Sequence, residues 1–136
     1  MDATSIRRYI VQTFAGVEVI DGTGGVFFFY GAEHKFPFAT LTTSDEYDQA
    51  SNLSRPDVFR LNVGVSKATF QALFTEADKQ ETHDFTALDR LMPHPVYGKM
   101  HWVCVLNPSA ATFPKARELL AEAYEMAAGK RASQRL

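Results

Sequence analysis

The sequence of 136 residues has a single cysteine, no apolar run long enough to cross a membrane, and almost no excess of charge of either sign. A single cysteine excludes an internal disulfide and a zinc site built from several cysteines. The formal net charge of -2 gives no overall attraction to nucleic acid or to an anionic membrane. The first residues lack the apolar stretch of a secretory signal, so we expect a cytoplasmic protein with no membrane partner.

Motifs of catalytic or cofactor-binding families are also lacking. The glycines of residues 22–25 stand between two expected strands, whereas a phosphate-binding loop leads into a helix, so they indicate a hairpin turn. Cys104 lies among apolar residues of an expected strand, which is typical of a buried, unreactive thiol. His94 and His101 have six residues between them, a spacing that matches neither a helical zinc motif nor a zinc finger. We therefore expect no cofactor and no metal.

The length and composition are those of an ordinary globular domain. Apolar residues make up 46% of the chain and charged residues 22%, which suffices for one hydrophobic core. We expect a single domain over residues 1–128 and a flexible C-terminal tail over residues 129–136.

Periodic patterns predict an α+β fold. Apolar residues at helical spacing predict helices over residues 4–14, from Ser66 onward, over 85–92 and over 112–128. Strands are expected over residues 17–20, 26–30, 36–42, 59–65 and 100–106, with the clearest alternation of apolar and polar residues from Phe59 to Val65. Tight connections between the early strands indicate a two-layer sandwich, in which a mostly antiparallel sheet of about five strands carries helices on one face.

The last third of the chain resembles the MmcQ/YjbR-like family of small bacterial proteins. The residues that carry this resemblance are Tyr97, Lys99, His101, Trp102, Glu118, Leu119, Leu120, Tyr124 and Glu125. From Ile6 through Ser109 the chain more closely resembles an uncharacterised actinobacterial family, a domain of unknown function, and that resemblance transfers no catalytic residue. The YjbR-like resemblance implies a two-layer α+β fold akin to secretion chaperones and, by analogy, a DNA-binding role.

A candidate binding site follows from the expected strands. Arg60 and Asn62 alternate with apolar residues, and His101 alternates in the same way with Met100 and Trp102. If both strands share one sheet, these three side chains converge on its uncovered face. Arginine, asparagine and histidine together suit a carboxylate or phosphate. The competing interpretation is an ordinary solvated sheet face.

The turn that precedes the last strand supplies the rest of this candidate site. We expect Tyr97, Lys99 and His94 to line its edge, with Tyr97 stacking on a ligand. The function predicted from these residues is a small soluble binding or interaction domain that captures an anionic or aromatic small molecule, or a peptide, on its sheet face. No catalytic residue is assigned.

Two other functions stay open at this point. One is a small enzyme that uses His101 or His94 as a general base, which requires proton-transfer geometry. The other is nucleic-acid binding by the YjbR-like analogy, which the charge balance does not favour. A homodimer is also left open, because the strand at residues 26–30 is apolar on both faces.

Overall fold

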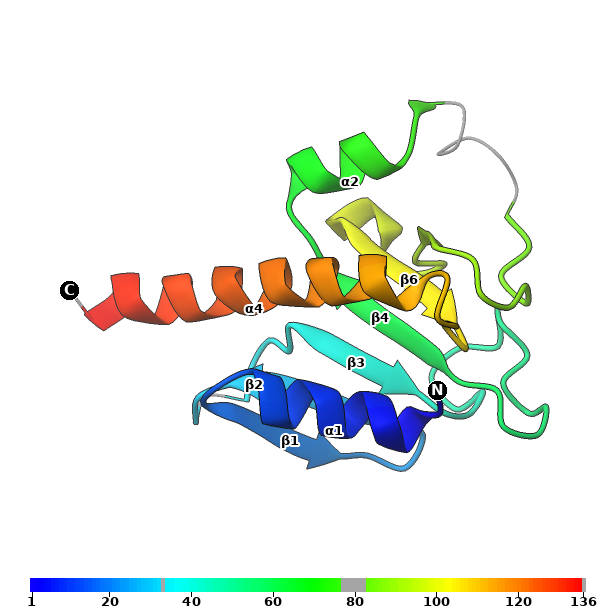
Figure 1. The fold of residues 1–136 in the computed structure, drawn as a ribbon, viewed down its shortest axis with the longest axis horizontal. Coiled ribbons are helices and arrows are strands. Elements are labelled where there is room, and N and C mark those ends of the chain that lie inside the picture. Colours follow the sequence, from blue (N-terminus) through cyan, green and yellow to red (C-terminus); the bar gives the residue numbers. More distant parts are fainter. Residues whose placement is uncertain (33, 77–82, 136) are drawn as a thin grey trace.

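The computed structural model describes residues 1–32, 34–76 and 83–135. Figure 1 shows a single sheet with α1 and α4 lying across the same side of it. The elements in chain order are α1 (Ala3–Thr13), β1 (Val17–Asp21), β2 (Gly25–Tyr30), β3 (Ala39–Thr42), β4 (Arg60–Gly64), α2 (Lys67–Leu73), β5 (Met92–Pro93), the 3₁₀ turn η1 (Gly98–Met100), β6 (Trp102–Leu106) and α4 (Phe113–Arg135). This arrangement confirms the predicted α+β class.

The sheet has the order β1-β2-β3-β4-β6-β5, and all neighbouring strands are antiparallel. It therefore has six strands instead of about five. The additional strand is β5, where we expected the end of a short helix over residues 85–92, and that helix prediction is wrong. Met92 pairs with Cys104 of β6, and Leu88 bridges to Leu106, so pairing along the sheet edge prevails over the helical spacing of the apolar residues. Residues 77–82 of the same connection lie outside the described residues.

Side-chain caps fix where the two shorter helices begin. The Asp2 carboxylate accepts the backbone N–H of Ser5 and the Ser5 hydroxyl reciprocates, which forms a capping box at the start of α1. Ser66, where the sequence pattern placed the start of this helix, caps α2 by accepting the backbone N–H of Thr69. The last helix, α4, extends to Arg135, beyond residue 128 where the sequence pattern ends.

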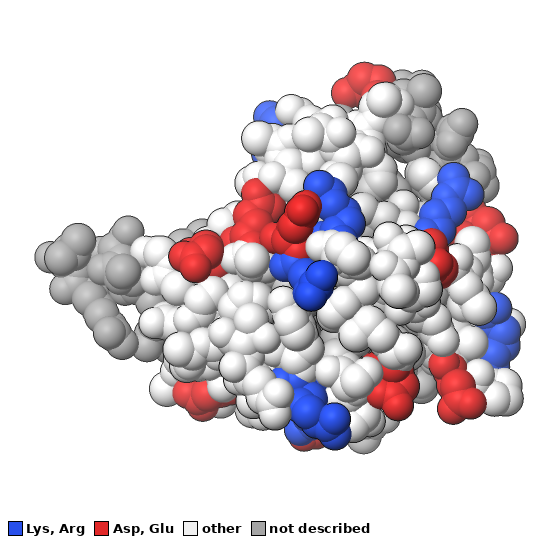
Figure 2. All heavy atoms as spheres, in the orientation of Figure 1, with Lys and Arg blue, Asp and Glu red and all other residues white. Residues whose placement is uncertain are grey.

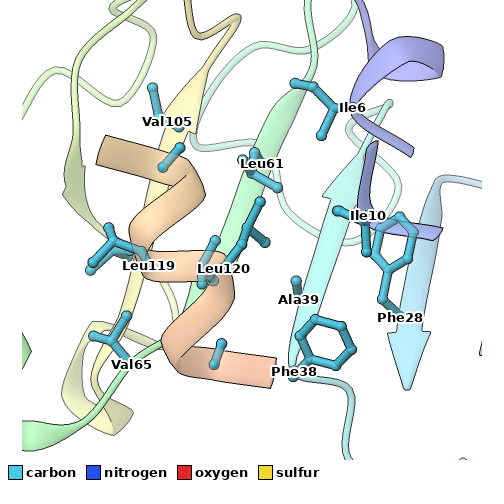
Figure 3. Close-up of a cluster of buried hydrophobic side chains, with 14 of the residues drawn as sticks. Ile6, Ile10, Phe28, Phe38, Ala39, Leu61, Val65, Val105, Leu119 and Leu120 are labelled. Carbon is cyan, nitrogen blue, oxygen red and sulfur yellow. The ribbon is translucent and has the colours of Figure 1, made fainter. Parts of the chain in front are cut away.

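The hydrophobic core fills the space between the helices and one face of the sheet. In Figure 3, Ile10 of α1 lies near Phe28 of β2, and Leu120 of α4 lies against Leu61 of β4. All four side chains are fully buried. Because burial is worth about 1.5–3 kcal/mol for each large apolar side chain, this layer is the main source of stability.

The opposite face of the sheet is covered where β4 crosses it. Leu61 and Val63 of β4 point to the helices, so Arg60 and Asn62 point to the other side, as the alternation predicted. Both are nevertheless only 1% exposed. The expectation of an uncovered polar face is wrong at this position, because the segments at residues 43–59 and 94–97 pack over the strand. That covered face carries the candidate site.

Candidate functional site

A buried hydrogen-bond network surrounds Arg60 on the covered face. Its Nη1 and Nη2 donate to the two carboxylate oxygens of Asp48, at 3.0 and 2.7 Å. Nη1 also donates to the Ser51 hydroxyl at 3.0 Å, and Nε donates to Asn62 Oδ1 at 2.8 Å. The guanidinium holds the pKa of Asp48 below its usual value, chiefly through these hydrogen bonds. Arg60 and Asp48 thus form a buried, mutually neutralised ion pair.

Asn62 fixes the side chains of the neighbouring strand. Its Nδ2 donates to the hydroxyls of Thr40 and Thr42, at 2.9 and 2.8 Å. Each threonine hydroxyl that accepts from Asn62 keeps its own hydrogen to donate. β3 and β4 therefore present a polar floor whose geometry is set by Asn62.

His94 approaches this network from the segment between β5 and η1. Its Nδ1 accepts the backbone N–H groups of Val96 and Tyr97, each at 3.0 Å. A neutral imidazole that accepts at Nδ1 carries its hydrogen at Nε2, so these two bonds assign the tautomer. Burial and the nearby Arg60 charge lower the pKa of His94 to about 4, so the ring is neutral at pH 7.

A groove of about 900 Å³ opens beside the network and extends around the end of the sheet to α4. Its polar side chains include Thr40, Thr42, Arg60, Asn62 and His94. Its aromatic lining is Phe27, Tyr30, Phe36, Phe38, Tyr47, Tyr97 and Trp102. Several apolar side chains at its rim are unusually exposed, among them Phe36 at 78%, Met100 at 67%, Tyr47 at 53% and Tyr97 at 52%. Exposed aromatic groups around a concavity are characteristic of a binding surface.

Trp102 and Gly64 shape one wall of this groove. The two residues face each other across β4 and β6. A Cβ at position 64 would lie 2.9 Å from Trp102 Cε2, which no real packing allows. Glycine at this position therefore lets the indole lie directly on the neighbouring strand.

The predicted site residues divide into two groups. Arg60, Asn62 and His94 come together, and the Tyr97 ring packs on that of His94 with centroids 5.1 Å apart. His101 does not join them. It follows η1 with a φ of 67°, before β6 begins at Trp102, and its ring packs on Phe70 at 5.6 Å. The predicted convergence of residues 60, 62 and 101 is therefore wrong, because the 3₁₀ turn delays the strand by two residues.

Lys99 lies with His101 on a different surface. Both line a smaller pocket of about 430 Å³ together with Phe70 and Phe85. His94 borders both hollows, but the groove on the covered face does not include Lys99 or His101.

The sequence profile of a family described as DUF6194, a family of unknown function, matches residues 1–135. The chain belongs to the DUF6194 family. Its fold is similar to that of a protein from Pseudomonas syringae whose crystal structure was solved as a structural-genomics target. That comparison has a TM-score of 0.58 at 13% identity and covers 93% of this chain and 99% of the other. No curated protein matches the sequence.

Three other features of this DUF6194 chain bear on its chemistry: its cysteine, its potential metal ligands and the polarity of its helices. Cys104 is fully buried, as predicted, and burial raises the pKa of its thiol to about 12. Within the part of the chain that the structure describes, no three His, Cys, Asp or Glu side chains gather as metal ligands. No helix among the same residues is long and apolar enough to span a bilayer.

Sequence reasoning missed the partners that complete the site. Asp48 and Ser51 lie in the polar segment between β3 and β4, which has no periodic pattern to reveal which side chain turns inward. Thr40 and Thr42 did carry a signal, because they alternate with buried Ala39 and Leu41 in the same way as Arg60 and Asn62 alternate in β4.

Proposed function

We propose that this DUF6194 domain is a binding module whose groove captures a small, planar aromatic molecule. The supporting observation is the exposed aromatic rim of the groove above a hydrogen-bonding floor. Aromatic side chains bind planar rings by stacking, and a few fixed polar groups orient the ligand. The proposal keeps the aromatic part of the function expected from the sequence.

Capture of a strongly anionic ligand by Arg60 has less support. Four hydrogen bonds tie its guanidinium to Asp48, Ser51 and Asn62, and the Asp48 carboxylate neutralises its charge. An anion would have to displace Asp48 from a buried pair, which leaves a carboxylate without its partner. Lys35 is a cation at the rim of the groove, with Nζ 5.7 Å from the centroid of the Phe36 ring.

Catalysis by His94 as a general base is also disfavoured. Both backbone N–H groups point at its Nδ1, and its Nε2 already carries the proton. The ring therefore offers no free lone pair to a substrate proton. Nucleic-acid binding is not favoured on the helix-covered face, because it would require a continuous patch of basic side chains. Figure 2 shows acidic and basic side chains next to one another around α1 and α4. The YjbR-like analogy, the cytoplasmic location and a homodimer stay predictions.

The groove is testable with 8-anilinonaphthalene-1-sulfonate, whose fluorescence rises on transfer to an apolar site. We expect saturable binding to the folded protein, and a Tyr97→Ala variant to weaken it about five- to tenfold through loss of one aromatic contact. The matched control is Val96→Ala, because Val96 is the adjacent residue, is equally exposed at 52%, and does not line the groove.

Circular dichroism must show that both variants keep the wild-type fold. Equal affinity of the dye for Tyr97→Ala and Val96→Ala would refute binding in this groove, as would the absence of binding to the folded wild type.

A further inference from the structure

Arg60 and His94 bring two nitrogen donors together at the side of the groove. Arg60 Nη2 and His94 Nε2 are 3.4 Å apart. This distance would suit a weak hydrogen bond if His94 accepted at Nε2. The tautomer excludes that, because Nδ1 is the acceptor for two backbone N–H groups and Nε2 therefore bears hydrogen. The two nitrogens face each other donor to donor.

Neither donor has a better partner within its own network. One hydrogen of Arg60 Nη2 is used by the Asp48 carboxylate at 2.7 Å, and the other is directed at His94. Both residues are buried: His94 is 6% exposed and Arg60 is 1% exposed. A buried N–H without an acceptor costs about 1–3 kcal/mol, so an acceptor atom that serves both groups would be strongly favoured.

The geometry admits such an atom from the groove side. An oxygen about 2.9 Å from each nitrogen, an ordinary hydrogen-bond length, lies off the line that joins two nitrogens 3.4 Å apart. Both N–H groups must therefore turn from that line toward the groove to donate to it. Both residues line the groove, and the Tyr97 ring packs on His94 at its rim. A ring stacked on Tyr97 could therefore direct a substituent toward this pair.

We propose that Arg60 Nη2 and His94 Nε2 form a two-donor subsite for the carbonyl oxygen of a planar aromatic ligand. This inference rests on the proposed function and specifies its ligand class. A neutral carbonyl fits better than a carboxylate, because the Asp48 carboxylate already lies on the same guanidinium and would repel a second anion. A water molecule can meet the same two bonds when the ligand is absent.

Three naphthalenes of matched size test the ligand class by isothermal titration calorimetry. 2-Acetylnaphthalene carries a neutral carbonyl, 2-isopropylnaphthalene carries no acceptor, and 2-naphthoate carries a carboxylate. We expect the ketone to bind the wild-type protein about tenfold more tightly than the alkyl compound, and more tightly than the carboxylate.

The donor is tested with His94→Asn. The Asn Oδ1 can replace Nδ1 as acceptor for the Val96 and Tyr97 N–H groups, while the Nε2 donor is lost. We expect the preference for the ketone to fall to about twofold or less. His101→Asn is the control, because His101 has the left-handed conformation that asparagine tolerates and lies outside the groove.

A second readout on the wild-type protein does not depend on how the variant folds. Nitrogen-15 NMR should show His94 as the Nε2–H tautomer, and the Nε2 proton should shift downfield with the ketone but not with the alkyl compound. Equal affinities for these two compounds, a preference for 2-naphthoate, or an Nδ1–H tautomer would each overturn the subsite. The groove itself would still stand if the sulfonated dye bound and lost affinity in Tyr97→Ala.

Discussion

Breaking the buried ion pair between Arg60 and Asp48 should lower stability more than breaking an exposed pair, and the protein contains an exposed pair that serves as the control. Arg7 and Asp21 form a second pair with the same two-pronged geometry, at 2.6 and 3.0 Å. The two pairs differ in burial: the Arg60 and Asp48 side chains are 1% and 15% exposed, whereas those of Arg7 and Asp21 are 40% and 61% exposed. Comparing them isolates the effect of the surroundings on one kind of contact.

We expect Asp48→Asn to lower the free energy of unfolding by about 3 kcal/mol, because it leaves the Arg60 guanidinium buried without a counter-charge. Asp21→Asn should change the free energy of unfolding little, because water and salt already screen that pair. The assay is urea unfolding at pH 7, followed by circular dichroism. A double variant, Asp48→Asn with Arg60→Met, should recover part of the loss, since it removes the unpaired charge.

The pH dependence gives a second check on the same pair. Because Arg60 lowers the folded-state pKa of Asp48 below the ordinary 3.8, the pair stabilises the protein above that pH. The contribution is lost as the pH falls further, through the lowered value. If Asp48→Asn cost no more than Asp21→Asn at pH 7, the reasoning that Asp48 compensates a buried charge would be refuted.

Three other measurements test separate parts of the structure. The pKa of His94 is about 4 in the folded protein against an ordinary 6.5, so the unfolded chain takes up the proton first as the pH falls. The free energy of unfolding should therefore fall by about 3 kcal/mol between pH 6.5 and pH 4. Urea unfolding across that range should show a weaker dependence of this free energy on pH in His94→Asn. Gly64→Ala should lower the free energy of unfolding by about 1–3 kcal/mol and shift the fluorescence emission of Trp102, because the new Cβ would lie 2.9 Å from the indole. In the control Gly98→Ala the new Cβ would have its nearest neighbour at 3.5 Å, so the emission should stay unchanged. Cys104 should react with a disulfide reagent only when the protein opens, since its thiol is fully buried with a pKa of about 12; rapid reaction under native conditions would contradict its position in β6.

The parts of the fold that could be predicted depend on neighbours in the sequence. The Asp2 cap of α1 and the Ser66 cap of α2 each involve residues three positions apart. The β1–β2 hairpin closes over a few residues around Gly22, and the alternation in β4 shows which of its side chains face the helices. Short-range hydrogen bonds and periodicity determine these features, so the sequence pattern is enough to locate them.

His101 shows where the same reasoning failed. Alternation from Met100 to Leu106 predicted one continuous strand, but η1 occupies Gly98–Met100 and His101 has a φ of 67°. A residue with positive φ breaks the two-residue period. Histidine is enriched at positive φ, but most histidines do not adopt it, so the residue type alone did not locate the break. His94, seven positions earlier in the same segment, takes the place that we expected His101 to hold.

The sequence alone determined the α+β class, the helix-facing sides of the strands and the side of β4 on which Arg60 and Asn62 lie, because backbone geometry imposes those periods on any chain. Only the tertiary structure decided that this side is covered, that Asp48 neutralises Arg60 across 12 positions, and that His94 meets the guanidinium from 34 positions away. Contacts between segments so distant depend on how irregular connections pack onto the sheet, and no local periodicity governs that packing.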